Sequence, residues 1–338
     1  MSITYASIDR VSTYIAQMPL TDINMVEAAE LRQGQLTKPP GSLGRLEQIA
    51  IWLAGWQEQE KPEINAPACL IFAGNHGITN KGVSAFPSEV TEQMVLNFQH
   101  GGAAINQLCK TAGASLNVFS LSLDKPTADF SEQPAMSIDD TLAAMQIGAD
   151  AIPDNADLIL PGEMGIGNTS SAAALSHLVF GDQPATWTGR GTGLDDDRLA
   201  HKTAIIKQAV ARIGDRPLDA VTMLSELGGR ELAAIAGCVL AARLRRIPVL
   251  LDGFISTAAC LPLWAANEHA LDHCQISHYS KEPGHRHVIN ALGKPAILDL
   301  DLRLGEASGA AIALMIVKAA LCTHNGMATF AEAGVSDG

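Results

Sequence analysis

Basic side chains are scarce in this sequence of 338 residues. Lysine and arginine number 23 against 36 aspartates and glutamates, which leaves a formal net charge of -13. An acidic protein is a poor match for a nucleic-acid backbone or an anionic membrane, because both attract basic surfaces. We therefore expect no nucleic acid and no membrane as a partner, and we look for a small-molecule ligand.

Paired cysteines and a secretion signal are also missing. The six cysteines show neither C-x-x-C spacing nor a disulfide framework, which favours reduced core thiols in a cytosolic protein. The first residues lack a basic start followed by an apolar core, and the chain has no charge-free apolar run of about 18 residues. These absences predict a cytoplasmic protein.

Small and branched aliphatic residues dominate what is present. Hydrophobic residues make up 47% of the chain, but aromatic residues only 4%. Such a composition is typical of helices packed on a buried parallel sheet. We expect an α/β fold with a Rossmann-like parallel sheet flanked by helices. The predicted large domain spans residues 30–290, and the terminal segments 1–29 and 291–338 together form a small helical domain.

Apolar runs that alternate with helical patterns predict the strands of this sheet. They lie at 68–73, 116–121, 158–160, 185–188 and 247–254. Several of these runs end in a glycine-containing turn. Because ligands gather at the carboxyl ends of the strands in open α/β sheets, polar residues in these turns are candidate site residues.

The most informative stretch is PGEMGIGNTSS at 161–171. It predicts a glycine-rich turn after a strand, and then a helix whose first residues Asn168, Thr169 and Ser170 supply caps and donors. Free N–H groups at such a helix start favour a phosphate, with a purely structural loop as an equal alternative. Glu163 points to a further role, because an acid beside a phosphate is costly unless it holds a sugar hydroxyl or a cation. The alternative is an acid favoured by the helix dipole.

Four further polar residues stand at the ends of predicted elements. His76 and Asp252 each follow a buried strand, although a structural role is the default for such a histidine. Lys202 lies in a helix after a second glycine turn and could reach an anion, unless it is a solvated surface lysine. Glu306 stands at the start of an almost wholly apolar helix. The helix dipole favours an acid at this position; alternatively, burial there raises the pKa of the acid, which suits a base.

Two clusters suggest metal ions, and we consider both readings weak. Asp195, Asp196 and Asp197 stand where acids commonly cap a helix. The five histidines between His269 and His287 lack an H-E-x-x-H or comparable ligand pattern. We therefore expect no metal site.

Taken together, these segments resemble the nicotinate-nucleotide–dimethylbenzimidazole phosphoribosyltransferases. From about Leu36 to Gly334 the family motifs occur in order: KPPGSLGRLE at 38–47, HG at 76–77, GEMG at 162–165, NT at 168–169, LLDGF at 250–254 and RLGE at 303–306. The resemblance implies transfer of phosphoribose from nicotinate mononucleotide to 5,6-dimethylbenzimidazole, with inversion at the anomeric carbon. It also implies a homodimer whose active sites include the neighbour's small domain.

The resemblance further implies roles for individual residues. Glu306 matches the general base, and Glu163 matches a second carboxylate near the ribose. Gly165, Asn168 and Thr169 match the phosphate loop, and Lys202 matches a lysine that neutralises the phosphate. The other implied substrate contacts are His76, Phe86, Pro87, Met94, Gly191, Asp252, Gly253, Leu304 and Gly305. No cofactor and no metal are implied, because pyridinium is already a cationic leaving group.

Two substitutions bear on the acceptor base. Phe86 and Met94 stand where a well-known member of the family has Ser and Gln. These apolar residues predict a flat, apolar benzimidazole as acceptor in preference to adenine. Two other classes remain as alternatives. A non-catalytic nucleotide-binding sensor of the same fold would need no base at Glu306, and a metal hydrolase would use the histidines between His269 and His287.

Overall fold

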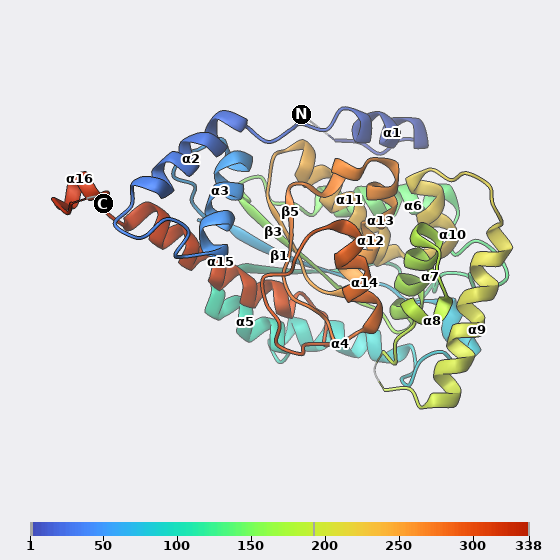
Figure 1. The fold of residues 1–338 in the computed structure, drawn as a ribbon. Coiled ribbons are helices and arrows are strands. Elements are labelled where there is room, and N and C mark those ends of the chain that lie inside the picture. The colour runs from blue at the N-terminus through green and yellow to red at the C-terminus, as the bar shows by residue number, and fades with distance from the viewer. Residues whose placement is uncertain (1–2, 192, 337–338) are drawn as a thin grey trace.

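A five-stranded parallel sheet forms the centre of the computed structural model, which describes residues 3–191 and 193–336 (Figure 1). Its strands are β1 (Pro67–Ala73), β2 (Ser115–Ser120), β3 (Leu158–Met164), β4 (Val249–Leu251) and β5 (Cys274–Ile276). They pair in the order β2-β1-β3-β4-β5. The order reverses between β1 and β3, and such a reversal opens a crevice at the carboxyl ends of the strands.

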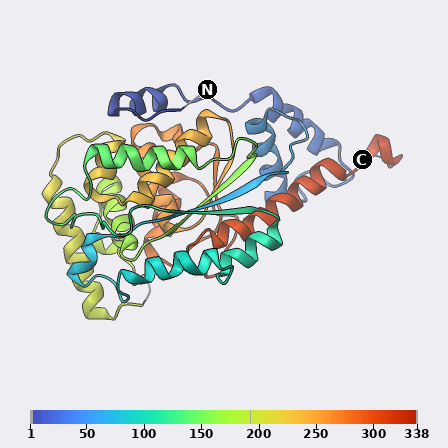
Figure 2. The same cartoon turned by 180° about the vertical axis from the view of Figure 1, so that it is seen from behind.

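Helices cover both faces of the sheet, which confirms the predicted fold class. One face carries α1 (Ile8–Ala16), α6 (Ile138–Asp150), α7 (Asn168–Phe180), α8 (Pro184–Trp187), α9 (Asp196–Ile213), α10 (Ala220–Leu227), α11 (Arg230–Leu244), α12 (Phe254–Ala259), α13 (Leu261–Ala266) and α14 (Pro283–Leu292). The other carries α3 (Arg45–Gln57), α4 (Glu89–Gln99), α5 (Ala104–Ala112) and α15 (Ser308–Gly326). Figure 2 shows α4 and α5 running along one border of the molecule. Burial on both faces explains why β1 is apolar throughout.

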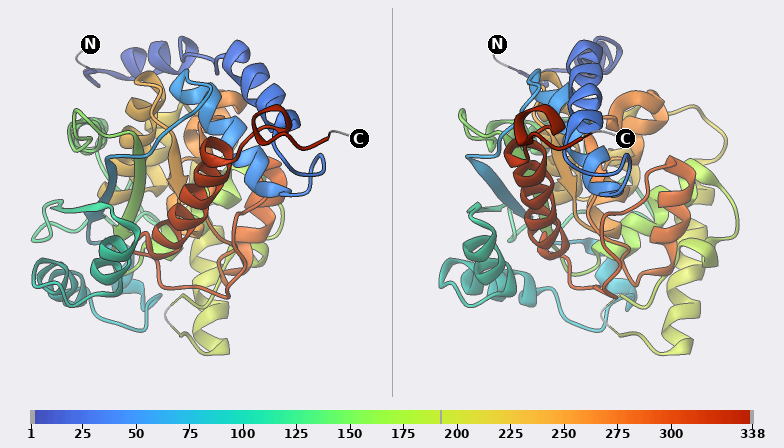
Figure 3. Two further views of the ribbon diagram at one scale, coloured as in Figure 1. Left: turned by 90° about the vertical axis from the view of Figure 1, so that its left-hand side faces the viewer. Right: turned by 60° about the vertical axis from the view of Figure 1, so that its left-hand side comes forward.

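Segments close to the two ends of the chain, residues 32–36 and 324–329, lie side by side. The remaining elements are α2 (Ile23–Gln35), α16 (Phe330–Ala333) and the 3₁₀ helices η1 (Gly77–Lys81) and η2 (Glu268–Leu271). Leu36 forms a β-bridge with Thr329, and the Arg32 guanidinium donates to the carbonyl oxygen of His324 at 2.8 Å. Figure 3 shows α2 and α3 next to the end of α15. The division into two domains stays a prediction.

β3 is longer than the sequence predicts. The expected strand ends at residue 160, but the observed strand continues through Pro161, Gly162 and Glu163 to Met164. Gly162 serves packing here rather than a turn. A Cβ at this position would come within 2.8 Å of the Cβ of Ala307, at the start of α15. Pro161 is tolerated in β3 because this strand pairs with β4 through one residue pair, Ile159 with Val249.

Three other local predictions differ from the structure. The segment 185–188, expected as a strand, lies in the single-turn helix α8, because proline is favoured in the first turn of a helix. The strand expected at 247–254 is limited to β4. The short strand β5 was not predicted, because its polar surroundings give no apolar run. Asp195 caps α9 by accepting from the Arg198 amide at 2.9 Å, which confirms the capping interpretation.

α15 is long and apolar enough by composition to cross a membrane. Half of its apolar window is buried inside the protein, where it packs on α3, α5 and the sheet. A buried core helix of a globular protein has the same length and apolar composition, so α15 is only weak evidence for a membrane-spanning helix. Of the six cysteines, five are buried, Cys322 on α15 is exposed, and all are free thiols.

Candidate active site

A cavity of about 100 Å³ opens at the carboxyl ends of β3 and β4. Three segments build most of its wall. β3 and the turn after it supply Glu163 to Thr169, the residues after β4 supply Asp252 to Ser256, and the loop before α15 supplies Arg303 to Gly305. A second, smaller cavity on the other side of the glycine-rich turn is lined by Thr169, Gly191 and Lys202. The turn therefore separates two adjoining spaces.

Glu306 lies between this cavity and the start of α15, in an uncommon backbone conformation. Gly305, Glu306 and Ala307 have φ angles of 85°, 62° and 60°, so three successive residues are left-handed. This region is unfavourable for residues with a side chain, and such strain is concentrated at functional sites. Only 5% of Glu306 is exposed, and its Oε2 atom has no hydrogen-bond partner among the described residues.

The surroundings of Glu306 favour its protonated form. Burial raises the pKa of Glu306 to about 7, and the nearby Asp252 carboxylate adds to the rise. Asp252 accepts a hydrogen bond from the Ala310 amide at 2.9 Å, and its Oδ1 lies 3.6 Å from the His278 Nε2 atom. Burial also raises the pKa of Asp252, while His278 and the Ala310 amide oppose the rise. A carboxyl group that titrates near neutral pH can accept a proton from a substrate.

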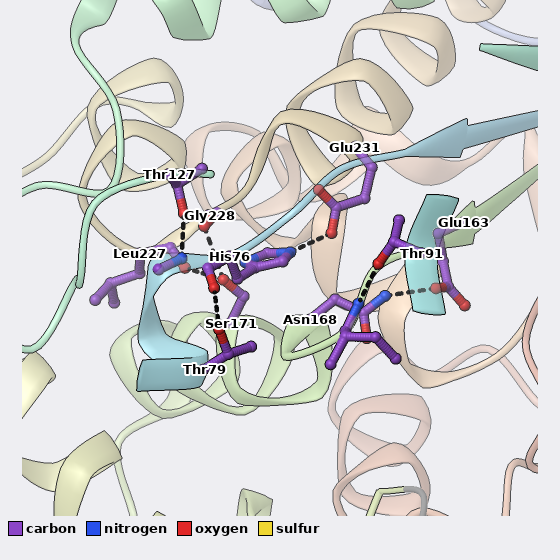
Figure 4. A network of polar contacts seen from close by, with 12 residues as sticks. His76, Thr79, Thr91, Thr127, Glu163, Asn168, Ser171, Leu227, Gly228 and Glu231 are labelled. Carbon is purple, nitrogen blue, oxygen red and sulfur yellow. Dashed lines mark hydrogen bonds and ion pairs between the residues drawn. The ribbon is translucent and has the colours of Figure 1, made fainter. Parts of the chain in front are cut away.

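Glu163 faces the same cavity from β3. Its Oε2 accepts a hydrogen bond from the Asn168 side-chain amide at 2.5 Å, as Figure 4 shows. Burial raises the pKa of Glu163 well above its ordinary value, Asp252 adds to this, and Asn168 opposes it. A Cβ at Gly305 would overlap the Glu163 carboxylate, so the loop before α15 lies directly over this acid. Glu163 thus lines the cavity, and Glu306 directly follows the lining residue Gly305.

Lys202 reaches the glycine-rich turn from α9. The side chain is fully buried, and its Nζ donates to Thr169 Oγ1 at 2.8 Å and to the Gly189 carbonyl at 3.2 Å. Burial lowers the pKa of Lys202 to about 8, and Glu282 opposes this change. The expectation that Asn168 and Thr169 cap α7 is wrong. Gly167 is the N-cap, and the two side chains bind Glu163 and Lys202 instead.

The remaining predicted site residues fall into two groups. Gly165, Gly191, Asp252, Gly253, Leu304 and Gly305 line the main cavity. The second group does not line this cavity: His76 is fully buried behind the turn, Phe86 and Pro87 are exposed before α4, and Met94 is half-buried on α4.

Two residues of the site were not singled out from the sequence, and a third, His278, was considered only as part of the histidine cluster. Glu282 and His278 line the cavity, and burial raises the pKa of Glu282. Glu231 lies behind the glycine-rich turn, hydrogen-bonded to His76. The sequence does contain a pattern that could have identified Glu231. It is an acid in the first turn of the apolar helix α11, just as Glu306 is an acid directly before α15. Glu282 and His278 follow β5, which the sequence did not reveal.

Neither of the two suggested metal clusters forms in the part of the chain that the structure describes. No group of three or more His, Cys, Asp or Glu side chains there could hold a metal ion. Burial lowers the pKa of His285 to about 3, so its ring is neutral. One ring nitrogen donates to the Thr257 hydroxyl, and the other accepts from the Ser280 amide. This histidine is therefore used in structural contacts.

A larger hollow lies elsewhere. It measures about 970 Å³ and is lined by residues 34–40 after α2 and by Thr329 to Val335 around α16. It contains none of the carboxyl groups with a raised pKa. We place the chemistry in the cavity of about 100 Å³ at the ends of β3 and β4, because perturbed titratable groups gather there at the ends of parallel strands.

Comparisons with known proteins cover nearly the whole chain. Residues 18–335 match the family described as "Phosphoribosyltransferase". A protein from Ruegeria sp. (strain TM1040), named nicotinate-nucleotide–dimethylbenzimidazole phosphoribosyltransferase, is 56% identical over 324 residues, or 96% of each chain. A protein of that name from Roseobacter denitrificans is 52% identical over 338 residues, or 100% of each chain. The crystal structure of CobT from Thermus thermophilus has a TM-score of 0.88 and 41% identity, and the match covers 93% of this chain and 100% of that one.

Proposed function

This chain belongs to the nicotinate-nucleotide–dimethylbenzimidazole phosphoribosyltransferase family, and on that premise we propose how the residues of the cavity carry out the reaction. The enzyme transfers phosphoribose from nicotinate mononucleotide to 5,6-dimethylbenzimidazole, in the lower-ligand branch of cobalamin biosynthesis. The products are α-ribazole 5′-phosphate and nicotinate. The observation that carries the residue assignment is Glu306, a buried carboxyl with a pKa raised to about 7 beside the cavity.

Glu306 acts as the general base. One nitrogen of the benzimidazole attacks C1′ of the ribose while the bond between C1′ and the nicotinate nitrogen breaks. The electron pair of that bond neutralises the pyridinium and leaves with nicotinate. The second nitrogen of the acceptor then carries a proton that it must lose, and Glu306 takes this proton. A carboxylate with a pKa near the working pH suits this transfer, because it holds the proton only as long as needed.

The glycine-rich turn and Lys202 bind the donor's phosphate. Thr169 and Lys202 converge on the smaller cavity, and the N-terminus of α7 lies beside it. Backbone N–H groups and the positive end of a helix favour an anion. A phosphate dianion there would also stabilise the ammonium form of Lys202 and offset the burial that lowers its pKa.

Glu163 and Asn168 hold the ribose between these two groups. A carboxyl and an amide that are already hydrogen-bonded to each other present the remaining oxygen lone pairs to sugar hydroxyls. Once ionised, Glu306 also places a negative charge beside the cavity, which favours positive charge developing at C1′. Pyridinium departs without a Lewis acid, so we propose that the reaction needs neither metal nor cofactor.

The acceptor binds next to Phe86, Pro87 and Met94. The first two residues are exposed, as a surface that receives a ligand must be. Their apolar side chains favour a flat benzimidazole. Equal concentrations of 5,6-dimethylbenzimidazole and adenine in one reaction test this assignment, and a clear preference for adenine would overturn it.

The enzyme is a cytoplasmic homodimer in which small helical domains from residues 1–29 and 291–338 complete the neighbour's site. Support comes from the exposed side chains of Leu20, Ile23 and Leu31, at or just before α2, and of Val335, just after α16. Exposed apolar patches of this kind mark protein contacts. Five buried free thiols fit a reducing compartment. Cell fractionation checks the location.

The first experiment mixes purified protein with nicotinate mononucleotide and 5,6-dimethylbenzimidazole in the presence of EDTA. Chromatography then follows nicotinate and the riboside phosphate. Equal amounts of both products support the catalytic assignment and its independence of divalent metal. Donor binding without product would instead support a nucleotide-binding sensor.

A further inference from the structure

A buried pair of side chains lies directly behind the glycine-rich turn. Glu231, in the first turn of α11, is hydrogen-bonded through Oε1 to the Nε2 atom of His76, which follows β1 (Figure 4). Both side chains are completely buried. The pair therefore makes no contact with solvent and lies outside the cavity that binds substrate.

The Glu231 carboxylate fills a space between three separate loops. A Cβ at Gly74 would overlap its Oε2, and a Cβ at Gly165 would come within 2.7 Å of its Oε1. A Cβ at Gly229 would overlap the His76 ring and come within 2.8 Å of Glu231 Oε2. Glycine at each position lets the backbone approach the pair closely. The carboxylate thus packs against the backbone of the glycine-rich turn itself.

Hydrogen bonds connect this turn to groups that line the cavity. The Asn168 amide donates to the Gly165 carbonyl at 3.2 Å, and the Asn168 side chain donates to Glu163. On the opposite side, the Ile166 amide donates to Thr91 Oγ1 at 3.2 Å. The turn is thereby held between a hydrogen bond from one side and the Glu231 carboxylate from the other.

We propose that Glu231, oriented by His76, is a positioning residue that fixes the turn at Gly165 and with it the donor-binding groups Asn168 and Glu163. A buried pair of polar side chains is a poor source of net stability, because desolvation cancels most of its attraction. Its geometric contact with the turn gives the pair a different use. The proposal rests on the enzyme's established family activity and concerns donor binding only.

Side-chain length separates this role from a general effect on folding. Glu231→Asp keeps the charge but withdraws the carboxylate from Gly165 by one methylene, whereas Glu231→Gln keeps the length and the acceptor for His76. We expect Glu231→Asp to raise KM for nicotinate mononucleotide about tenfold, since small misplacements of binding groups cost this much. Glu231→Gln should stay within about twofold of wild type, as should KM for the acceptor in both variants.

Glu226→Asp is the matched control. Glu226 is also buried, pairs with Arg212 at 2.7 Å and lies on the neighbouring helix α10. The Glu226→Asp substitution should lower the melting temperature of the protein without changing KM for nicotinate mononucleotide. Calorimetric titration with nicotinate mononucleotide alone gives a second readout that needs no turnover. An unchanged donor KM in Glu231→Asp, or an equal rise in Glu226→Asp, overturns the proposal. Absence of product from the wild type would instead count against the catalytic assignment.

Discussion

Glu306 combines burial with a strained backbone. Two successive non-glycine residues, Glu306 and Ala307, are left-handed, and such conformations cost on the order of 1–3 kcal/mol each. The surrounding contacts must offset this cost. Gly162 leaves room for Ala307 against β3, and Asp252 accepts from the following helix. The strain holds the carboxyl in place before substrate arrives, so little reorganisation is needed during the reaction.

Glu306→Gln tests the role of the base. The amide keeps the size of the side chain but cannot accept the acceptor's proton. We expect donor binding to persist while kcat falls by roughly two to four orders of magnitude, the usual contribution of a positioned base. Glu268→Gln, on an exposed acid in η2, is the control. Near-wild-type turnover in Glu306→Gln would remove this residue from the mechanism.

The pH dependence of the wild-type enzyme follows from the same residue. The base must be ionised, and the pKa of Glu306 is raised to about 7. Activity should therefore be full above that pH and fall as the pH drops through it, by about tenfold at one pH unit below the midpoint. A profile of kcat/KM between pH 5.5 and pH 9 measures this acid limb. A midpoint near pH 4.5, the ordinary range of an exposed glutamate, would contradict it.

The same shift predicts an unusual effect on stability. The folded-state pKa of Glu306 lies above its unfolded value, so the folded state binds the proton more tightly. This group therefore costs stability as the pH rises from about 4.5 through 7. Glu306→Gln should melt at a higher temperature than wild type at pH 8 and lose this advantage near pH 5. Thermal denaturation at the two pH values measures the difference.

At this scale, the sequence revealed residues that carry chemistry more readily than residues that support them. Glu163 and Glu306 each follow a glycine in the sequence, which drew attention to them from the sequence alone. Glu231 and His76 interact across 155 positions in the chain. Contacts of that kind depend on how the loops fold together, so they cannot be predicted from a local sequence pattern.

At the scale of elements, the start of α15 ties the base to the sheet. Asp252, directly after β4, accepts from the Ala310 amide in the first turn of this helix. Its charge also helps to raise the pKa of Glu306. A single carboxylate therefore caps a helix and adjusts the neighbouring base.

Asp252→Asn separates these two effects. The amide oxygen can still accept from Ala310, but the negative charge near Glu306 is lost. The pKa of Glu306 should fall, so the acid limb of kcat/KM should move to lower pH by roughly half a unit or more. The midpoint is the readout, because Asp252 also lines the cavity and the plateau rate can change. The control is Asp301→Asn, an exposed acid paired with Lys281. An unmoved or raised midpoint would contradict this account.

Elements with strong apolar patterns were predicted well, and short ones were not. β1 is buried along its whole length and coincides with the apolar run at 68–73, so its composition defines it. α8 has only four residues and β5 only three. Their conformations are set by tertiary contacts such as the stacking of Trp187 on Phe180, with ring centroids 5.5 Å apart. Local sequence carries too little information to specify such short segments.

At the scale of the whole molecule, the exposed surface of α2 is part of the dimer surface that we propose. Ile23 and Leu31 on α2 are 58% and 65% exposed. Ile23→Glu combined with Leu31→Glu should convert the dimer to monomers, because charges at a dimer interface are costly to bury. Light scattering coupled to gel filtration measures the mass. Ile147→Glu, on the exposed side of α6, should leave the mass unchanged. A dimer that survives the double substitution would place the interface elsewhere.

The overall architecture followed from composition and from the order of the motifs. Aliphatic runs between helical patterns predicted the parallel sheet, and the motifs fell at the carboxyl ends of its strands. The hollow next to α16 was not foreseen, because it is formed by residues 34–40 and 329–335 from opposite ends of the chain.

The distribution of thiols offers a spectroscopic use. Cys322 is exposed near the end of α15, while the other five cysteines are buried. A maleimide dye should therefore attach at one position per chain without any engineered substitution, because reaction requires access to the sulfur. Energy transfer between donor-labelled and acceptor-labelled chains would then report subunit exchange in real time.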